Sequence, residues 1–193
     1  MMKTVIYTHG MGGIAEEAEN YRGVFNCPVS GIDYSDYTPW TARETIRREY
    51  EKLTRGYDET ELISVSIGAY LSMLALSDKP IKRAYFISPV VDMESLILDM
   101  MAAQDISEAE LKEKGEIENK FGEPLSWKYL SFVRDNPPIW NVPTEILYAD
   151  KDHLTKAETI KTFAKDHRAG LTVINAEHYI RQDAVLAFLK EKH

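Results

Sequence analysis

Short apolar segments rich in β-branched residues recur along the chain, and stretches with helical periodicity separate them. This alternation is typical of a parallel sheet that helices cover on both faces. About six strands are predicted in this way: Thr4–Thr8, Val29–Asp33, Glu61–Val65, Arg83–Ser88, Glu145–Tyr148 and Leu171–Asn175. The pattern therefore predicts a three-layer α/β fold around a small, mostly parallel sheet.

Two of the connections between strands carry clear helix signals. After the second predicted strand, Thr41 and Glu44 form a T-x-x-E capping box, and Gly56 stands where a left-handed residue would end the helix. A second box of the same kind opens the segment 155–170, whose final glycine is the predicted stop. Both segments are expected to be helices.

The alternation is interrupted between residues 92 and 141, where no strand is apparent. Met93–Met101 and Ser107–Lys114 have helical patterns, and a capping box starts the second of them. We therefore expect a single domain over residues 1–193, with a helical insertion at residues 92–141.

Charge and cysteine content narrow the classes of partner. The 193 residues include 23 Lys and Arg against 31 Asp and Glu, a formal net charge of −8. Such a chain repels polyanions and anionic lipid surfaces, so neither nucleic-acid nor membrane partners are expected. Cys27 stands alone in the sequence, which excludes an internal disulfide and a multi-cysteine metal cage. No signal-peptide core or apolar span of membrane length is present, and a cytoplasmic protein is expected.

A serine stands at an abrupt transition from strand to helix. A turn this sharp strains its central residue by about 1–3 kcal/mol and needs small residues two positions away on each side. Ser64 and Gly68 meet that need around Ser66. A turn centred on Ser64 would instead place Leu62 at a crowded flank. Ser66 is therefore the predicted nucleophile, with the N–H of Ile67 as an oxyanion donor. The alternative interpretation is a serine that only caps the helix.

A glycine-rich loop, His9-Gly10-Met11-Gly12-Gly13, follows the first predicted strand. Glycines let the backbone turn tightly and present N–H groups to an anion. The two phosphate-binding patterns, G-x-x-x-x-G-K-[ST] and G-x-G-x-x-G, are both absent. We expect an oxyanion loop in which Met11 supplies the second donor, and a structural role for His9.

A serine nucleophile needs a base, and the base needs an orienting carboxylate. Candidates follow the last two predicted strands: Asp150 and Asp152 in one loop, His178 in the next. The carboxyl ends of parallel strands share one edge of a sheet, so these loops should meet Ser66 there. Three further histidines lie beside the carboxylates, on a predicted helix and at the C-terminus: His153, His167 and His193. The histidines lack the paired spacing of a metal site, and no metal or other cofactor is expected.

Together these segments resemble the α/β-hydrolase fold, whose nucleophile elbow and Ser, Asp, His chain order they share. The likeness spans nearly the whole chain, which is similar to small bacterial hydrolases. The family spacing assigns the acid to Asp152 rather than Asp150, three residues past the small Ala149. Two features depart from the family: Ser64 stands where the elbow usually has glycine, and the opening antiparallel hairpin is missing.

The resemblance implies a serine hydrolase with Ser66, Asp152 and His178 as its triad and with the N–H groups of Met11 and Ile67 as its oxyanion hole. It would cleave a small-molecule carboxylic ester or thioester through an acyl-enzyme intermediate, without a cofactor. The insertion would serve as a lid whose methionines and leucines line an acyl pocket. Two alternatives stay open at this point: a non-catalytic binding protein on the same scaffold, and an acyltransferase or lyase of the same fold.

Overall fold

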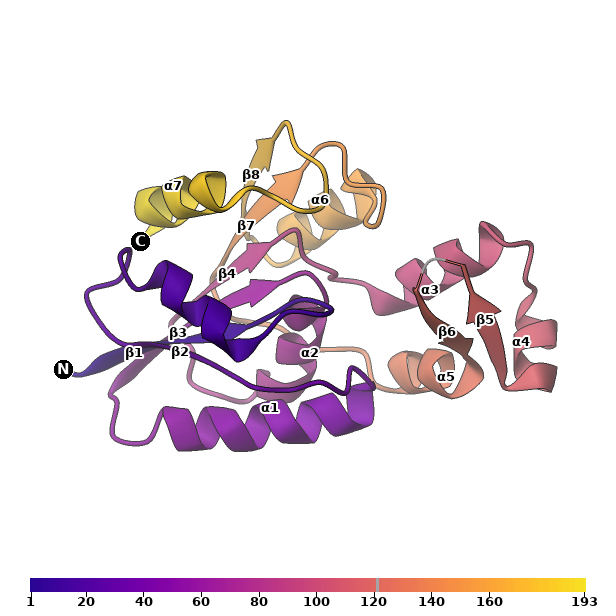
Figure 1. The fold of residues 1–193 in the computed structure, drawn as a ribbon, viewed down its shortest axis with the longest axis horizontal. Coiled ribbons are helices and arrows are strands. Elements are labelled where there is room, and N and C mark those ends of the chain that lie inside the picture. Colours follow the sequence, from indigo (N-terminus) through magenta and orange to yellow (C-terminus); the bar gives the residue numbers. More distant parts are fainter. Residues whose placement is uncertain (121) are drawn as a thin grey trace. The chain divides into compact units, whose positions relative to one another are not determined.

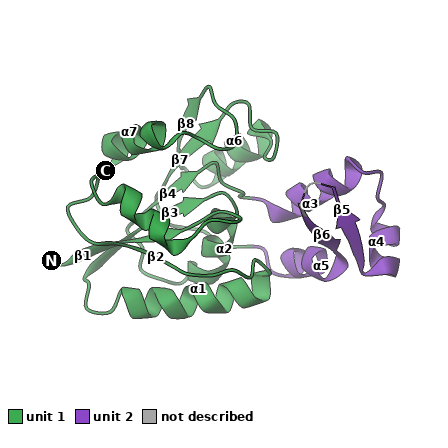
Figure 2. Cartoon of the chain, in the orientation of Figure 1, with its two compact units in different colours: residues 1–91, 138–193 green, residues 92–137 purple. Residues whose placement is uncertain are grey.

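The structure is a computed structural model (Figure 1) that describes residues 1–120 and 122–193. These residues divide into two compact units (Figure 2). The first comprises residues 1–91 and 138–193, and the second comprises residues 92–137. Residue 121, inside the predicted insertion, lies outside the described residues. The single-domain description with an insertion at residues 92–141 stays a prediction.

Six strands form the sheet of the first unit, in the order β2-β1-β3-β4-β7-β8 (Figure 1). Every neighbouring pair in this sheet is parallel. Their bounds are β1 Lys3–Thr8, β2 Val29–Gly31, β3 Glu59–Val65, β4 Arg83–Ile87, β7 Thr144–Ala149 and β8 Gly170–Ile174. The six predicted strands are therefore confirmed, with shifts of a residue or two at their ends.

Helices cover both faces of this sheet. They are the 3-10 helix η1 (Ala15–Tyr21), α1 (Pro39–Leu53), α2 (Ile67–Leu76), α6 (Ala157–Asp166) and α7 (Gln182–Lys192). Because successive strand residues point to opposite faces, Tyr7 and Ile63 pack with buried residues of η1 and α7 on one side. On the other side Phe86 contacts Phe163 of α6. Helix α2 is buried along its whole length, as a helix that is apolar all round should be.

In its described residues, the second unit contains three helices and a two-stranded hairpin: α3 (Met93–Ala102), α4 (Glu108–Lys114), β5 (Glu116–Asn119), β6 (Gly122–Ser126) and α5 (Trp127–Asp135). Leu111 and Leu130 are fully buried within it. The guanidinium of Arg134 on α5 pairs with Glu94 of α3 at 2.6 Å and with Glu108 of α4 at 2.7 Å. These ion pairs connect the three helices of the unit.

The expectation that residues 92–141 contain no strand is wrong, because β5 and β6 form an antiparallel hairpin there. Ile117 is the single apolar residue of β5, and β6 contains a proline, so neither segment shows the alternation that predicts a strand. Ile117 lies opposite Leu125 across the ladder, and Leu125 is buried. A single cross-strand apolar pair was too weak a signal to recognise in the sequence.

Two predicted helix starts are also wrong. Helix α1 begins at Pro39, with Thr38 as its N-cap, rather than at a capping box on Thr41. Proline suits the first helical position because its missing N–H would have no intrahelical partner there. Helix α6 begins at Ala157 with Lys156 as N-cap, since the hydroxyl of Thr155 is engaged elsewhere.

Gly170 is not the stop of α6 but the first residue of β8. The left-handed backbone after the helix is taken by Arg168, with a φ of 52°. A Cβ at position 170 would lie too close to Oε2 of Glu145 on β7, so a larger residue there would require the flexible Glu145 side chain to move. None of the helices in the described part of the chain combines the length and apolar character that crossing a bilayer requires.

The core of the first unit gives a direct test of the packing. Ile63 is fully buried in an interior strand, so Ile63→Ala should lower the free energy of unfolding by about 2–5 kcal/mol through lost burial and a cavity. Val173 on the edge strand β8 is 51% exposed, and Val173→Ala should change it by no more than about 0.5 kcal/mol. Urea denaturation measures both. Equal effects of the two substitutions would contradict this description of the core.

Candidate active site

Ser66 forms the turn between β3 and α2. Its φ of 52° and ψ of −123° lie in a region that residues with a side chain rarely adopt. The end of β4 holds this backbone on both sides: the N–H of Ser66 donates to the carbonyl of Ile87 at 2.9 Å, and the N–H of Val90 donates to the carbonyl of Ser66 at 3.0 Å. The surrounding hydrogen bonds therefore stabilise a backbone conformation that is unfavourable for an isolated serine.

Small residues let the loop after β1 approach this turn. A Cβ on Gly68 would lie 2.6 Å from the carbonyl oxygen of His9 and 2.8 Å from that of Thr8. A Cβ on Gly10 would lie 3.3 Å from the Cβ of Ser66. The lack of a side chain at position 68 is thus required for the close approach of the glycine-rich loop, and at position 10 a side chain would make a tight contact with Ser66.

A chain of hydrogen bonds joins Ser66, His178 and Asp152. The Oγ of Ser66 lies 2.9 Å from Nε2 of His178, and Nδ1 of the same ring lies 2.8 Å from Oδ2 of Asp152. An ionised carboxylate only accepts hydrogen bonds. The proton of the neutral imidazole therefore belongs on Nδ1, which leaves Nε2 free to accept the hydrogen of the serine hydroxyl.

The surroundings of Asp152 keep it ionised. Burial works to raise the pKa of Asp152 and is the strongest single influence, but the hydrogen bond and charge of His178 and the N–H groups of Leu154 and Thr155 oppose it. Their combined effect holds the pKa below its ordinary value. The carboxylate accepts from Leu154 N at 2.8 Å, Thr155 N at 3.2 Å and Thr155 Oγ1 at 2.9 Å.

The loops after β7 and β8 are bonded to each other. Asp150 N donates to the carbonyl of Ile174 at 2.9 Å, and Lys151 N donates to that of Ala176 at 3.0 Å. The carboxylate of Asp150 accepts the N–H of Ala176 at 3.3 Å. Of the two candidate carboxylates, Asp152 is therefore the one in contact with His178, while Asp150 connects the two loops.

The glycine-rich loop is a tight turn closed by a bond from Gly13 N to the Gly10 carbonyl at 3.0 Å. Gly12 has a φ of 74°, which a type II turn requires at its third residue. The hydroxyl of Tyr37 accepts the N–H of Gly12 at 2.9 Å and donates to the Gly10 carbonyl at 3.2 Å. The N–H of Gly13 is thus bonded within the loop and that of Gly12 is bonded to Tyr37. The N–H of Met11, between Gly10 and Gly12, is the predicted oxyanion donor.

Aromatic residues hold this loop from behind. His9 is fully buried, and its ring stacks on Tyr34 with centroids 4.1 Å apart. Nδ1 of His9 lies 2.9 Å from the Gly10 carbonyl oxygen, and the hydroxyl of Tyr34 donates to the carbonyl of His9.

Sequence reasoning missed Tyr34 and Tyr37, because tyrosines in the loop after β2 carry no local signal of a contact with the loop after β1. The hydroxyl of Thr155 was also missed, since its T-x-x-E pattern was taken for a helix cap.

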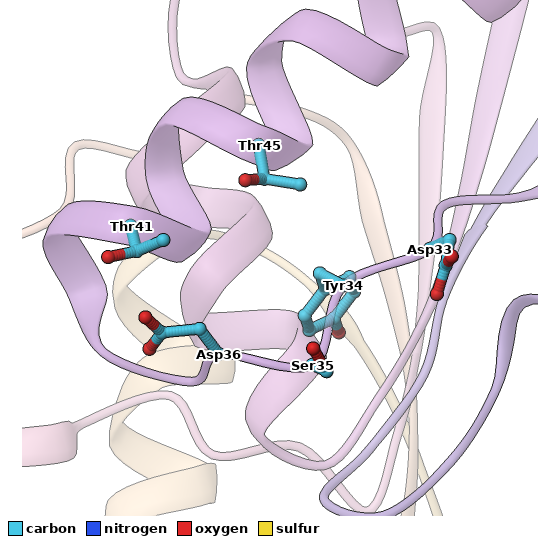
Figure 3. Close-up of a pocket in the computed structure, with 6 residues that line it drawn as sticks. All are labelled: Asp33, Tyr34, Ser35, Asp36, Thr41 and Thr45. Atoms are coloured by element: carbon cyan, nitrogen blue, oxygen red, sulfur yellow. The ribbon is translucent and has the colours of Figure 1, made fainter.

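A separate pocket of about 260 Å³ lies between the loop after β2 and the start of α1 (Figure 3). Its lining is polar and contains two carboxylates: Asp33, Tyr34, Ser35, Asp36, Thr41 and Thr45. None of these side chains takes part in the hydrogen bonds of Ser66 or His178. In residues 1–120 and 122–193, no group of three His, Cys, Asp or Glu side chains has the arrangement needed to hold a metal ion.

Neither a protein-family model nor a curated protein sequence matches the chain. Solved structures do. Est1E from Butyrivibrio proteoclasticus superposes with a TM-score of 0.73 at 16% identity, over 99% of this chain and 86% of that one. Alpha/beta hydrolase domain-containing protein 10 from mouse superposes with a TM-score of 0.71 at 15% identity, over 98% of this chain and 87% of that one. A thioesterase domain from the curacin biosynthetic pathway superposes with a TM-score of 0.58 at 14% identity, over 97% of this chain and 91% of that one.

The chain has the α/β-hydrolase fold. The fold expected from the glycine-rich loop, the elbow and the chain order is thereby confirmed, and at these identities the likeness concerns the fold. On this α/β-hydrolase sheet Ser66 follows β3, Asp152 follows β7 and His178 follows β8. The three side chains expected to meet at the carboxyl edge are in contact there.

The close approach at Gly68 predicts a steric effect of a single methyl group. Alanine is the better helix former by about 1 kcal/mol, yet its Cβ would meet two backbone carbonyls that side-chain rotation cannot relieve. Gly68→Ala should therefore destabilise the protein, by about 1–3 kcal/mol. Gly23→Ala is the matched control, because nothing lies within 4 Å of a Cβ there. Thermal unfolding compares the two, and a stabilised Gly68→Ala variant would contradict the predicted clash.

The lowered pKa of Asp152 predicts how stability depends on pH. Its hydrogen bonds favour the ionised form in the folded state, so they stabilise the fold in full above the unfolded-state pKa of about 3.9. The contribution is lost as the pH falls through the lower folded-state pKa. Asp152→Asn should thus lower the free energy of unfolding by about 1.5–3 kcal/mol at pH 7. The difference in free energy of unfolding between this variant and wild type should become smaller below about pH 4. Urea denaturation at a series of pH values measures it; a difference that widens with acidification would contradict the assignment.

Proposed function

We propose that the protein is a serine hydrolase that cleaves a small-molecule carboxylic ester or thioester. The observation that carries the proposal is the hydrogen-bonded series from Ser66 through His178 to Asp152. A nucleophile, a base and an orienting carboxylate in contact are the arrangement that activates a serine hydroxyl.

In the first step Nε2 of His178 takes the proton of Ser66 while Oγ attacks the acyl carbonyl carbon. The carbonyl oxygen becomes an anion, and the N–H groups of Met11 and Ile67 donate to it. Ile67 is the first residue of α2, and the first N–H groups of a helix have no partner within the helix and carry its positive end. Collapse of the tetrahedral intermediate expels the alcohol or thiol, which leaves with the proton held by His178.

In the second step water hydrolyses the acyl-enzyme. Nε2 of His178 takes a proton from the water, whose oxygen attacks the acyl carbon, and the proton then returns to Oγ of Ser66 as the carboxylic acid departs. Asp152 stays ionised throughout, holds the Nδ1–H tautomer and stabilises the imidazolium that forms in each step.

The similar structures support this reaction class. They include a thioesterase domain and Est1E with ferulic acid bound. A small-molecule acyl substrate, a cytoplasmic location and the absence of nucleic-acid and membrane partners remain predictions from the sequence. So does a lid role for the second unit.

Substitution of the nucleophile tests the proposal. Ser66→Ala should abolish covalent labelling by a fluorophosphonate probe and lower kcat for p-nitrophenyl esters by about 10⁴-fold or more. Asp152→Asn should lower kcat to a similar degree, because the wrong tautomer is then favoured. Ser35→Ala is the control, because Ser35 is exposed and lies outside the hydrogen-bond series. This variant should be labelled by the probe and should hydrolyse the esters as wild type does.

Two outcomes would overturn the proposal. Undiminished labelling of Ser66→Ala would show that another residue is the nucleophile. A wild-type protein that binds esters but neither turns them over nor reacts with the probe would be a binding protein on this scaffold. Product analysis with water and with an added alcohol separates hydrolysis from acyl transfer.

A further inference from the structure

Three hydroxyl groups meet inside the first unit, on elements that lead to the proposed nucleophile and oxyanion donors. The Oγ1 of Thr8 lies 2.7 Å from the Oγ of Ser64 and 2.9 Å from that of Ser72, and the two serine oxygens are 3.2 Å apart. All three residues are fully buried. We call these three residues the hydroxyl cluster.

The members of the hydroxyl cluster come from three different elements. Thr8 is the last residue of β1, Ser64 is near the end of β3, and Ser72 lies on α2. Thr8 and Ser64 are also direct partners in the register of the two strands. The cluster therefore adds side-chain bonds across a strand pair and from that pair to the helix above it.

Each of these elements leads into one part of the proposed machinery. Two residues separate Thr8 from Met11, one separates Ser64 from Ser66, and α2 begins with Ile67. The nucleophile and both oxyanion donors thus stand a short distance along the chain from a member of the hydroxyl cluster.

Hydroxyls are a costly choice for this interior position. A buried hydroxyl without a partner destabilises a fold, while an apolar group of the same shape carries no such penalty. Here every hydroxyl has two partners within the cluster, since each can donate once and also accept. Small size alone does not explain Ser64, because glycine or alanine would relieve the crowding at the elbow equally well. Directional bonds, which hold a distance, are what the hydroxyls add.

We propose that Thr8, Ser64 and Ser72 are positioning residues that set the spacing between the Met11 N–H, the Ile67 N–H and the Ser66 hydroxyl. This inference rests on the proposed function. An oxyanion donor acts at 2.7–3.1 Å from the developing anion, and a displacement of about 1 Å can cost on the order of 10²-fold in rate. Loss of the cluster bonds should therefore act on the transition state more than on substrate binding.

Thr8→Val tests the role because it keeps the shape of the side chain and removes the hydroxyl. We expect kcat for a p-nitrophenyl ester to fall by about 10–100-fold and KM to change by less than about 2-fold, since the transition state and not ground-state binding is affected. Thr8→Ser restores the hydroxyl and should recover kcat to within about 3-fold of wild type. Ser64→Ala and Ser72→Ala break the same cluster from its other members and serve if Thr8→Val does not fold.

Thr144→Val is the matched control. Its hydroxyl is also buried and also bonded, to Trp140 Nε1 at 2.9 Å and to the Val142 carbonyl at 2.7 Å. It stands at the first residue of β7, at the opposite end of the strands from Ser66. Thr144→Val should lower Tm while leaving kcat per folded molecule unchanged, which separates a positioning effect from general destabilisation.

The outcomes distinguish this inference from the proposed function. If wild type hydrolyses esters and folded Thr8→Val or Ser64→Ala retains its kcat, the hydroxyl cluster has no positioning role. The same conclusion follows if Thr144→Val loses as much kcat as the cluster variants. If wild type itself neither reacts with a fluorophosphonate nor hydrolyses esters, the proposed function fails, and the inference that rests on it fails as well.

Discussion

The strained backbone of Ser66 is the constraint on which the rest of the site depends. A residue with a side chain keeps a φ of 52° only if contacts with its surroundings stabilise this conformation by more than the strain destabilises it. Hydrogen bonds from the end of β4 supply part of this stabilisation. The glycine-rich loop can approach closely because position 68 carries no side chain, and a side chain at position 10 would be in tight contact with Ser66. The two glycines and the strained serine therefore form one steric unit, although they come from separate segments.

The parallel sheet then determines what meets that serine. Every strand of the sheet runs in the same direction, so the loops after β1, β3, β7 and β8 all emerge at one edge. Backbone bonds between the loops after β7 and β8 hold Asp152 and His178 in register, and Asp150 contributes through its side chain. Asp152 contacts the imidazole of His178, and Asp150, which does not contact it, helps to hold the two loops together.

Local patterns predicted much of this architecture, and spatial contacts account for what they missed. The elbow around Ser66 and the loop at Met11 carry their signals within a few residues, because the steric demand of a sharp turn acts on chain neighbours. The β5–β6 hairpin was missed since its one apolar pair, Ile117 with Leu125, is visible only once the strands are paired. Thr155 was misread for a related reason: one hydroxyl can cap a helix or bind a carboxylate, and the sequence pattern is the same in both cases.

The position where the chain departs from the usual elbow shows why a steric rule is an incomplete description of the site. A small residue at position 64 is required by crowding, and on that ground serine is merely tolerated. In the folded protein the Ser64 hydroxyl bonds with Thr8 and Ser72, so the added oxygen contacts both neighbouring elements. An isolated buried oxygen would have destabilised the elbow. The serine in place of glycine is therefore satisfied by the hydroxyls at positions 8 and 72, and the three residues are better understood as one feature than as three polar residues in a core.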